Sequence, residues 1–121
     1  MRMSEVRFPR GAPVTGYGPE GFEIGGVWHA GAVLLLGAVS AWRPAAPLTP
    51  ACFAEALAAV DRFDLIILGT GADLAPPPPE TRAALEAAGF GVEIMATPSG
   101  CRTYNVLLAE DRAVCAALLT V

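Results

Sequence analysis

A continuous aliphatic segment, Leu65-Ile66-Ile67-Leu68, constrains the fold of this chain more than any other feature. A strand that is apolar at consecutive positions buries both of its faces, as the central strand of a parallel sheet does. Gly69-Thr70-Gly71 ends the segment, and the four prolines at 76–79 then favour a stiff, extended connection. The segment 64–68 therefore predicts an inner strand of a sheet with helices packed on both faces.

Helix signals before and after this strand support an α/β arrangement. Thr49-Pro50 and Thr97-Pro98 each combine an N-cap residue with a proline, which is tolerated at the first helical position. Gly89 supplies a C-terminal stop for the helix that follows the prolines. The predicted elements are a helix at 49–61, a strand at 64–68, a helix at 80–88, a strand at 91–96 and a helix at 97–118. A final short strand from Ala113 is the alternative to the last part of that helix.

The first third of the chain predicts strands. Segments 14–17 and 22–27 flank the turn Gly18-Pro19-Glu20-Gly21, whose residues suit a reversal between antiparallel strands. A continuous apolar run predicts a buried strand at 32–36, and a short strand follows at 39–42. We therefore expect a layered α/β fold around a mixed sheet, with an N-terminal β meander.

Length and composition predict one folded domain. The chain has 121 residues, which is too few for two independent cores. Its hydrophobic content of 54% with 17% charged residues excludes intrinsic disorder. Residues 1–12 show no sustained period, so we expect a flexible N-terminal arm at 1–12 and a single α/β domain at 13–121.

Charge and cysteine content exclude several classes of function. Eight arginines and no lysine stand against twelve carboxylates, and this net charge of -4 argues against a nucleic-acid partner. The longest apolar run, 30–39, is about half of the roughly 20 residues that a membrane-spanning helix needs. Three widely spaced cysteines predict a reduced cytoplasmic compartment. His29 is the only histidine, so we expect no metal site, no histidine-dependent triad and no cofactor.

Cys101 is the one candidate nucleophile. The prediction places it in the first turn of the helix that Thr97 opens, next to Arg102, and both the helix N-terminus and a guanidinium stabilise a thiolate. The same position also suits a buried thiol, because Cys101 shares a helix face with Tyr104 and Leu108. Cys52 and Cys115 are expected in the core.

Two polar groups are candidate binding residues. Gly69, Thr70 and Gly71 follow a parallel strand, where open α/β sheets place their ligands, although this loop does not run directly into a helix as a phosphate-binding loop does. Arg102, Thr103 and Asn105 could recognise a carboxylate, a phosphate or a partner backbone. Their alternative role is to satisfy the hydrogen bonds of neighbouring loops and strand ends.

Three segments of the chain together resemble a known family. They are Tyr17-Gly18-Pro19-Glu20-Gly21-Phe22, Leu68-Gly69-Thr70-Gly71, and the stretch that begins Thr97-Pro98-Ser99-Gly100-Cys101-Arg102-Thr103-Tyr104-Asn105 and continues through Val106-Leu107. The chain resembles the proteins labelled domain of unknown function 498, which include mitochondrial respiratory complex I assembly factor 3. The resemblance implies a layered α/β fold, no established activity or cofactor and, in mitochondria, a role in building the membrane-bound NADH dehydrogenase through protein contacts.

Two functions follow as hypotheses. The first is a non-catalytic interaction or assembly-factor-like module that binds another protein, such as a subunit of a membrane complex, through the loop 69–71 and the polar residues of the last helix. Such a protein would be cytoplasmic, bacterial and peripheral to the inner membrane through its partner. The alternative is a small-ligand binder or enzyme in which Cys101 is the nucleophile, Arg102 holds an anion and the loop amides add donors.

Overall fold

The computed structural model describes residues 10–121, and a five-stranded mixed sheet forms its centre. The strand order is β5-β4-β8-β6-β7. These strands are β4 (Val33–Leu36), β5 (Ala38–Ala41), β6 (Leu65–Gly69), β7 (Gly91–Met95) and β8 (Val114–Leu118). β6 pairs in parallel with β7 and β8, while β4 pairs antiparallel with β5 and β8. The predicted inner strand and mixed sheet are confirmed.

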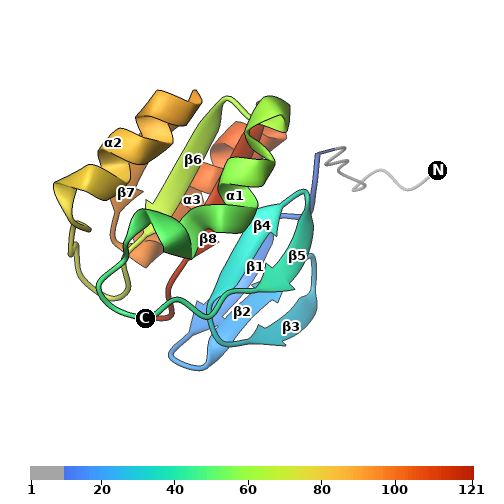
Figure 1. The fold of residues 1–121 in the computed structure, drawn as a ribbon. Helices are drawn as coiled ribbons and strands as arrows, with labels where there is room; N and C mark the ends of the chain where they lie inside the picture. Colours follow the sequence, from blue (N-terminus) through green and yellow to red (C-terminus); the bar gives the residue numbers. More distant parts are fainter. Residues whose placement is uncertain (1–9) are drawn as a thin grey trace.

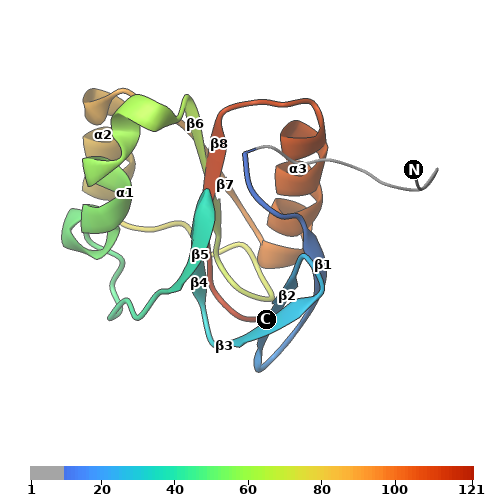
Figure 2. The same ribbon diagram turned by 90° about the vertical axis from the view of Figure 1, so that its right-hand side faces the viewer.

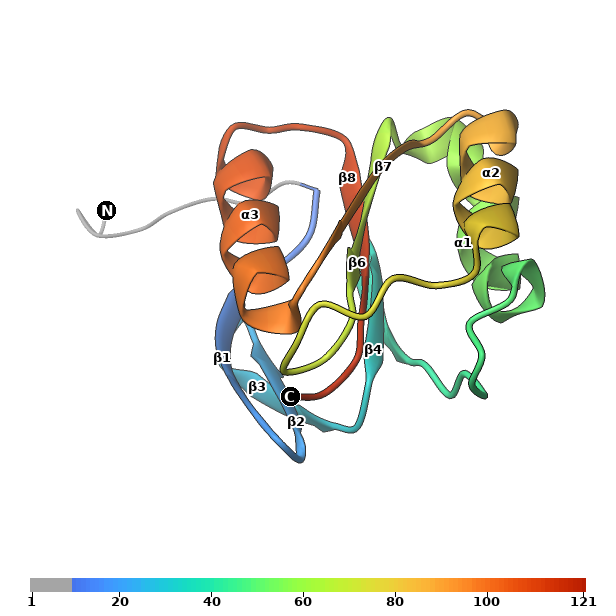
Figure 3. The same ribbon diagram turned by 90° about the vertical axis from the view of Figure 1, so that its left-hand side faces the viewer.

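Each face of this sheet is covered by a separate layer (Figure 1). The helices α1 (Ala54–Ala58) and α2 (Pro79–Ala88) lie on one face, and α3 (Thr97–Ala109) lies on the other beside a second, smaller sheet. Figures 2 and 3 show the central sheet edge-on between the two layers. Side chains of β6 alternate between them, since Ile66 and Leu68 join the cluster under α1 and α2 while Ile67 joins the cluster under α3.

The smaller sheet is an antiparallel meander with the order β1-β2-β3. It consists of β1 (Val14–Gly18), β2 (Gly21–Ile24) and β3 (Val27–Ala30). Phe22 and Ile24 are buried against the central sheet, so the predicted N-terminal meander is confirmed. The prediction of one strand at 22–27 is wrong, because Gly25 and Gly26 take φ values of 57° and 84° and turn the chain.

The helix predicted at 97–118 is also wrong beyond Ala109. The chain turns at Glu110–Arg112, where Asp111 adopts a left-handed φ of 59°, and the following residues form β8. β8 lies between β4 and β6 and is buried at every position. A strand buried on both faces carries no alternation, and its alanines carry no strand preference, so the helical spacing of Leu107, Val114 and Leu118 was misleading. The alternative, a final strand from about Ala113, is the correct one.

The helix predicted at 49–61 is broken into three short pieces. A 3-10 turn at Pro50–Phe53 precedes α1, and another at Val60–Arg62 follows it. Phe53 and Ala59 leave helical geometry, with φ near -108° and -104°. Thr49 makes no side-chain cap, contrary to the prediction. Phe53 packs against Trp42 with ring centroids 5.4 Å apart, so tertiary packing rather than a continuous hydrogen-bond ladder fixes this segment.

The predicted N-terminal arm is described only from its tenth residue. Residues 1–9 lie outside the described part. Arg10 forms an ion pair with Asp111 at 3.0 Å, and Ala12 packs against the core under α3. Between residues 10 and 121, no helix has the length and apolar character needed to span a bilayer.

Candidate functional site

The predicted loop 69–71 lies against the start of α3, and Thr97 joins the two. β6 and β7 are parallel with Gly69 opposite Met95, so their carboxyl ends meet at one edge of the sheet. The fully buried Thr97 hydroxyl accepts the Gly71 N–H at 2.8 Å and donates to the Leu119 carbonyl at 2.7 Å. The Thr97 N–H in turn donates to the Gly71 carbonyl at 2.8 Å. This junction ties β6, α3 and the chain after β8 together.

The polar groups of the loop are used within the protein. The Thr70 hydroxyl donates to the Asp73 carbonyl at 2.7 Å and accepts the Ala75 N–H at 2.9 Å. The Thr70 N–H donates to the Met95 carbonyl, and the Gly69 carbonyl accepts the Leu119 N–H. The Thr70 hydroxyl and N–H and the Gly69 carbonyl are therefore already hydrogen-bonded to backbone groups of the protein. The glycines allow close packing at this junction. A binding role for Gly69, Thr70 and Gly71 stays a prediction.

Cys101 is buried, and it lies in the second turn of α3 rather than in the first turn, where it was predicted. The difference arises because Ala96, not Thr97, is the N-cap residue. Burial raises the pKa of the Cys101 thiol to about 11, and the neighbouring Arg102 guanidinium lowers it by a smaller amount. Cys101 shares a buried helix face with Tyr104 and Leu108, so the interpretation of Cys101 as a buried thiol is confirmed. At neutral pH this thiol keeps its proton, which disfavours nucleophilic attack.

Thiol labelling of the folded chain checks this assignment. At pH 7.5 we expect a small alkylating reagent to modify Cys52 first, because Cys52 is half-buried whereas Cys101 and Cys115 are buried. Cys101 should react at least tenfold more slowly than a free thiol, since only the thiolate is nucleophilic. Site-resolved mass spectrometry over time measures the three rates, with urea-unfolded chain as the control. If Cys101 were modified as fast as Cys52, the result would contradict this assignment and support the hypothesis that Cys101 is a nucleophile.

The polar residues of α3 point in different directions. Asn105 reaches across to β1, where its Nδ2 donates to the Val14 carbonyl at 2.7 Å and its Oδ1 accepts the Val14 N–H at 2.8 Å. Arg102 is exposed and donates to the Ser99 hydroxyl at 3.2 Å, and Thr103 is half-buried. Asn105 thus satisfies backbone groups of an edge strand, the structural role considered above. A binding role for Arg102, Thr103 and Asn105 stays a prediction.

Replacing Asn105 separates its structural role from a binding role. Asn105→Ala leaves both Val14 backbone groups without their side-chain partner, so we expect a loss of about 1–3 kcal/mol in the free energy of unfolding. Urea denaturation followed by circular dichroism measures it. Arg102→Ala is the matched control on the same helix and should change stability by less than about 0.5 kcal/mol. Equal stability of the two variants would contradict the structural assignment.

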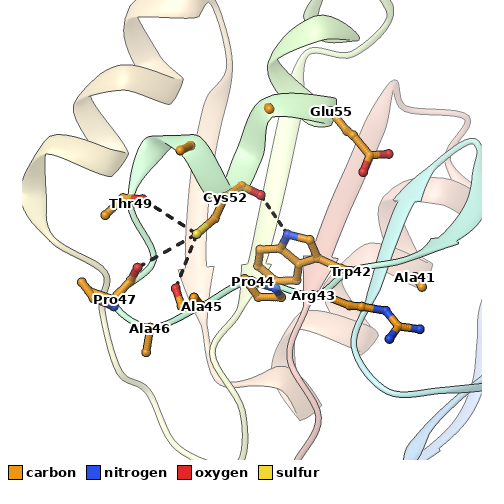
Figure 4. A pocket seen from close by; sticks show the side chains of 12 residues that line it. Ala41, Trp42, Arg43, Pro44, Ala45, Ala46, Pro47, Thr49, Cys52 and Glu55 are labelled. Carbon is orange, nitrogen blue, oxygen red and sulfur yellow. Dashed lines mark hydrogen bonds between the residues drawn. The ribbon is translucent and has the colours of Figure 1, made fainter.

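A surface hollow of about 700 Å³ lies elsewhere, beside the segment that links β5 to α1. Figure 4 shows the Cys52 sulfur in its wall, where the thiol donates to the Ala45 carbonyl at 3.6 Å. Cys52, predicted as a core residue, is half-buried and packs at the margin of the core under α1 and α2. Arg43 and Glu55 also line the hollow, but their side chains point away from the sulfur. Charged groups do not converge on the thiol here.

Comparison with known proteins identifies the family. The family described as "Protein of unknown function (DUF498/DUF598)" matches residues 14–119. The chain belongs to this family. An uncharacterised protein of Rhodobacter capsulatus is 41% identical over 120 residues, which cover 98% of this chain and 93% of that protein.

Two further relatives connect the family to a process and to a solved fold. The chain is 30% identical to mouse NADH dehydrogenase [ubiquinone] 1 alpha subcomplex assembly factor 3 over 95% of its length, and it spans 64% of the mouse protein. A crystal structure of an outer membrane protein from Bartonella henselae matches with a TM-score of 0.85 and 33% identity, over 95% of this chain and 99% of that one. The resemblance to assembly factor 3 proteins and the α/β fold are thereby confirmed.

Sequence reasoning missed two features of this molecule. One is Thr97, predicted as a helix cap but used as the hydrogen-bonding centre of the junction. The other is the exposure of Tyr17, Val27 and Trp28 on the smaller sheet, at 43%, 59% and 52%. The signal for the second was present, since Gly25-Gly26 between two apolar segments is typical of a tight hairpin. That hairpin predicts a further strand at Val27 and Trp28, but not that this strand lies at an edge of the sheet.

Proposed function

We propose that this chain is a non-catalytic protein-interaction module that assists the assembly of an NADH dehydrogenase. The observation that carries this proposal is the similarity to the mouse assembly factor, which extends over 95% of the chain. A match of this extent includes both sheets and the helices α1, α2 and α3 rather than one motif. What we transfer from the mouse protein to this chain is the general role of an assembly factor, without assigning a particular subunit as its partner.

The surface of the smaller sheet supports a protein partner. Tyr17, Val27 and Trp28 are large apolar side chains that stay exposed although the core of the same sheet is tightly packed. Aromatic residues are enriched at the centres of protein interfaces, where they supply much of the binding energy. Arg102 and Val106 are also exposed, one turn apart on α3, and α3 lies on the same side of the central sheet as the smaller sheet (Figure 2).

The proposed setting is a bacterial cytoplasm, with contact to the inner membrane made through the partner. Three free cysteines support a reducing compartment. The relative in Rhodobacter capsulatus supports a bacterial source.

Affinity isolation from the cell that encodes the chain tests this function. A tagged chain, cross-linked in the cell and purified, should enrich NADH dehydrogenase subunits at least tenfold over an unrelated tagged protein of similar size. Quantitative mass spectrometry provides the measurement. Deletion of the gene should lower the amount of fully assembled complex on a native gel. Absence of enrichment together with unchanged assembly would overturn the proposal.

A further inference from the structure

The connection from β6 to α2 contains four consecutive prolines, Pro76–Pro79, which the proposed function does not use. A proline ring fixes φ at about -65°, and the residue before a proline is confined to extended backbone. Pro76, Pro77 and Pro78 each precede a proline, so both constraints apply to all three, and the peptide bonds are trans. Together these constraints specify a polyproline II helix. The backbone of Pro78 agrees, with φ -53° and ψ 143°.

One side of this proline stretch faces solvent. Figure 3 shows the connection, in yellow, crossing the outside of the molecule between the end of β6 and the start of α2. Pro76 and Pro79 are exposed, whereas Pro77 and Pro78 are half-buried, and Leu74 just before the stretch is 59% exposed. A polyproline II helix has three residues per turn, so Pro76 and Pro79 lie on the same side of it. The solvent side of the stretch is therefore a ridge of two proline rings, one turn apart.

Hydrogen bonds hold the stretch at both of its ends. The Thr70 hydroxyl accepts the N–H of Ala75, directly before the first proline, at 2.9 Å. At the other end the Pro78 carbonyl accepts the Thr81 N–H at 2.9 Å. The buried Thr81 hydroxyl donates in turn to the Leu48 carbonyl at 2.6 Å, which fixes the start of α2. A partner therefore meets the stretch in a preformed conformation, and binding it costs little conformational entropy.

The backbone of the stretch offers hydrogen-bond acceptors but no donors. Proline has no N–H, so the stretch cannot add itself to a sheet as a strand. Within residues 10–121, no hydrogen bond uses the carbonyl oxygens of Ala75, Pro76 or Pro77. Tryptophan and tyrosine match this surface, because each combines a ring that packs on proline with an N–H or O–H that donates to a carbonyl. Aromatic-lined grooves recognise polyproline II segments in this way.

A second copy of this chain does not supply such a groove. In the described part of the chain the exposed aromatic side chains are Tyr17 and Trp28. Tyr17 is paired with Phe22 across β1 and β2, and Trp28 is paired with Glu23 across β2 and β3. Cross-strand partners share a face of a sheet, and consecutive residues lie on opposite faces. Tyr17 and Trp28 therefore project from opposite faces of the smaller sheet and cannot line one groove.

We propose that Pro76–Pro79 is a docking ligand for another protein, whose groove of tryptophan and tyrosine side chains closes on the ridge of Pro76 and Pro79. A ring N–H or O–H of that groove donates to a carbonyl of Ala75, Pro76 or Pro77. Helix initiation does not account for the stretch, because α2 has only Pro79 at its first position. The proposal goes beyond the function proposed above: this surface leads into α2, across the central sheet from the smaller sheet, and does not depend on what binds there.

Purified polyproline-binding domains test the proposal on the full chain. The probes are an SH3 domain, a WW domain and an EVH1 domain, which bind polyproline II segments in aromatic-lined grooves. We expect at least one of them to bind saturably and to shift the backbone amide signals of Leu74, Ala75 and Glu80 in NMR spectra. Failure of all three domains to bind, or shifts confined to the smaller sheet, would overturn the proposal.

Two proline variants complete the experiment. Pro76→Ala removes one ring of the ridge but keeps the extended backbone, because position 76 still precedes a proline. It should weaken binding about tenfold. Pro19→Ala is the matched control, since Pro19 is an exposed proline in the turn between β1 and β2, and it should bind like the wild type. Equal binding by Pro76→Ala and the wild type overturns the proposal, as does self-association of the chain that Pro76→Ala abolishes, because the occupant is then a second copy.

Discussion

Thr97→Val should destabilise the protein by about 2–4 kcal/mol, the largest effect that we expect from a single substitution. Valine keeps the shape of threonine but removes the hydroxyl that accepts from Gly71 and donates to Leu119. Each buried polar group left without a partner costs about 1–3 kcal/mol. Thr97 is fully buried, so water does not replace the lost bonds without structural change. Urea denaturation monitored by tryptophan fluorescence measures the loss.

Thr97→Ser is the matched control for this variant. Serine keeps the hydroxyl and loses one methyl group, which costs about 1 kcal/mol in a packed core. The expected order of stability is therefore wild type, serine variant, valine variant. A valine variant as stable as the serine variant would show that the hydroxyl does not hold the junction together.

Gly69→Ala should cost about 2–3 kcal/mol through overpacking. A Cβ at this position would lie 2.8 Å from the Thr97 Oγ1, 2.9 Å from the Leu118 Cδ2 and 3.1 Å from the Thr97 Cα. The Thr97 atoms cannot move freely, because the hydroxyl is hydrogen-bonded and the backbone begins α3. Differential scanning calorimetry and urea denaturation both report the change.

Gly18→Ala is the control for the glycine substitution. A Cβ on Gly18 has nothing within 4 Å, and this glycine is in a strand where alanine is allowed. Its replacement should be neutral or slightly stabilising, by up to about 1 kcal/mol. If both alanine variants unfold at the same urea concentration, the close packing between β6 and α3 does not limit stability.

The fold was predictable where a segment had one unambiguous period or composition. The short aliphatic run Leu65–Leu68, ended by Gly69, indicated a strand buried on both faces, and parallel pairing then brought Gly69 to the start of α3. β8 was predicted only as the alternative to a longer last helix, because an alanine-rich strand buried on both sides resembles a helix until β4 and β6 are seen to need a partner between them. Tertiary packing likewise decided the break at Phe53.

The sequence predicted where the loop 69–71 lies in the fold, but not how tightly it packs or that Cys101 beside it is buried. Sequence patterns bring the loop 69–71 to Thr97, yet they do not reveal that Gly69 packs so closely against Thr97 and Leu118 that no Cβ fits there. The thiol pKa of Cys101 depends on burial, which is a property of the whole fold. Conversely, the exposed side chains of β3 follow from which strand happens to lie at an edge, and that is decided by contacts distant in sequence.

Photo-cross-linking inside the cell tests most directly whether this protein works by binding a partner through its smaller sheet. A photoreactive amino acid replaces Trp28 on β3 in one strain and the exposed Ala87 on α2, across the central sheet, in another. We expect an adduct from position 28 that contains an NADH dehydrogenase subunit, and none from position 87. Adducts of equal yield from both positions, or from position 87 alone, would contradict it.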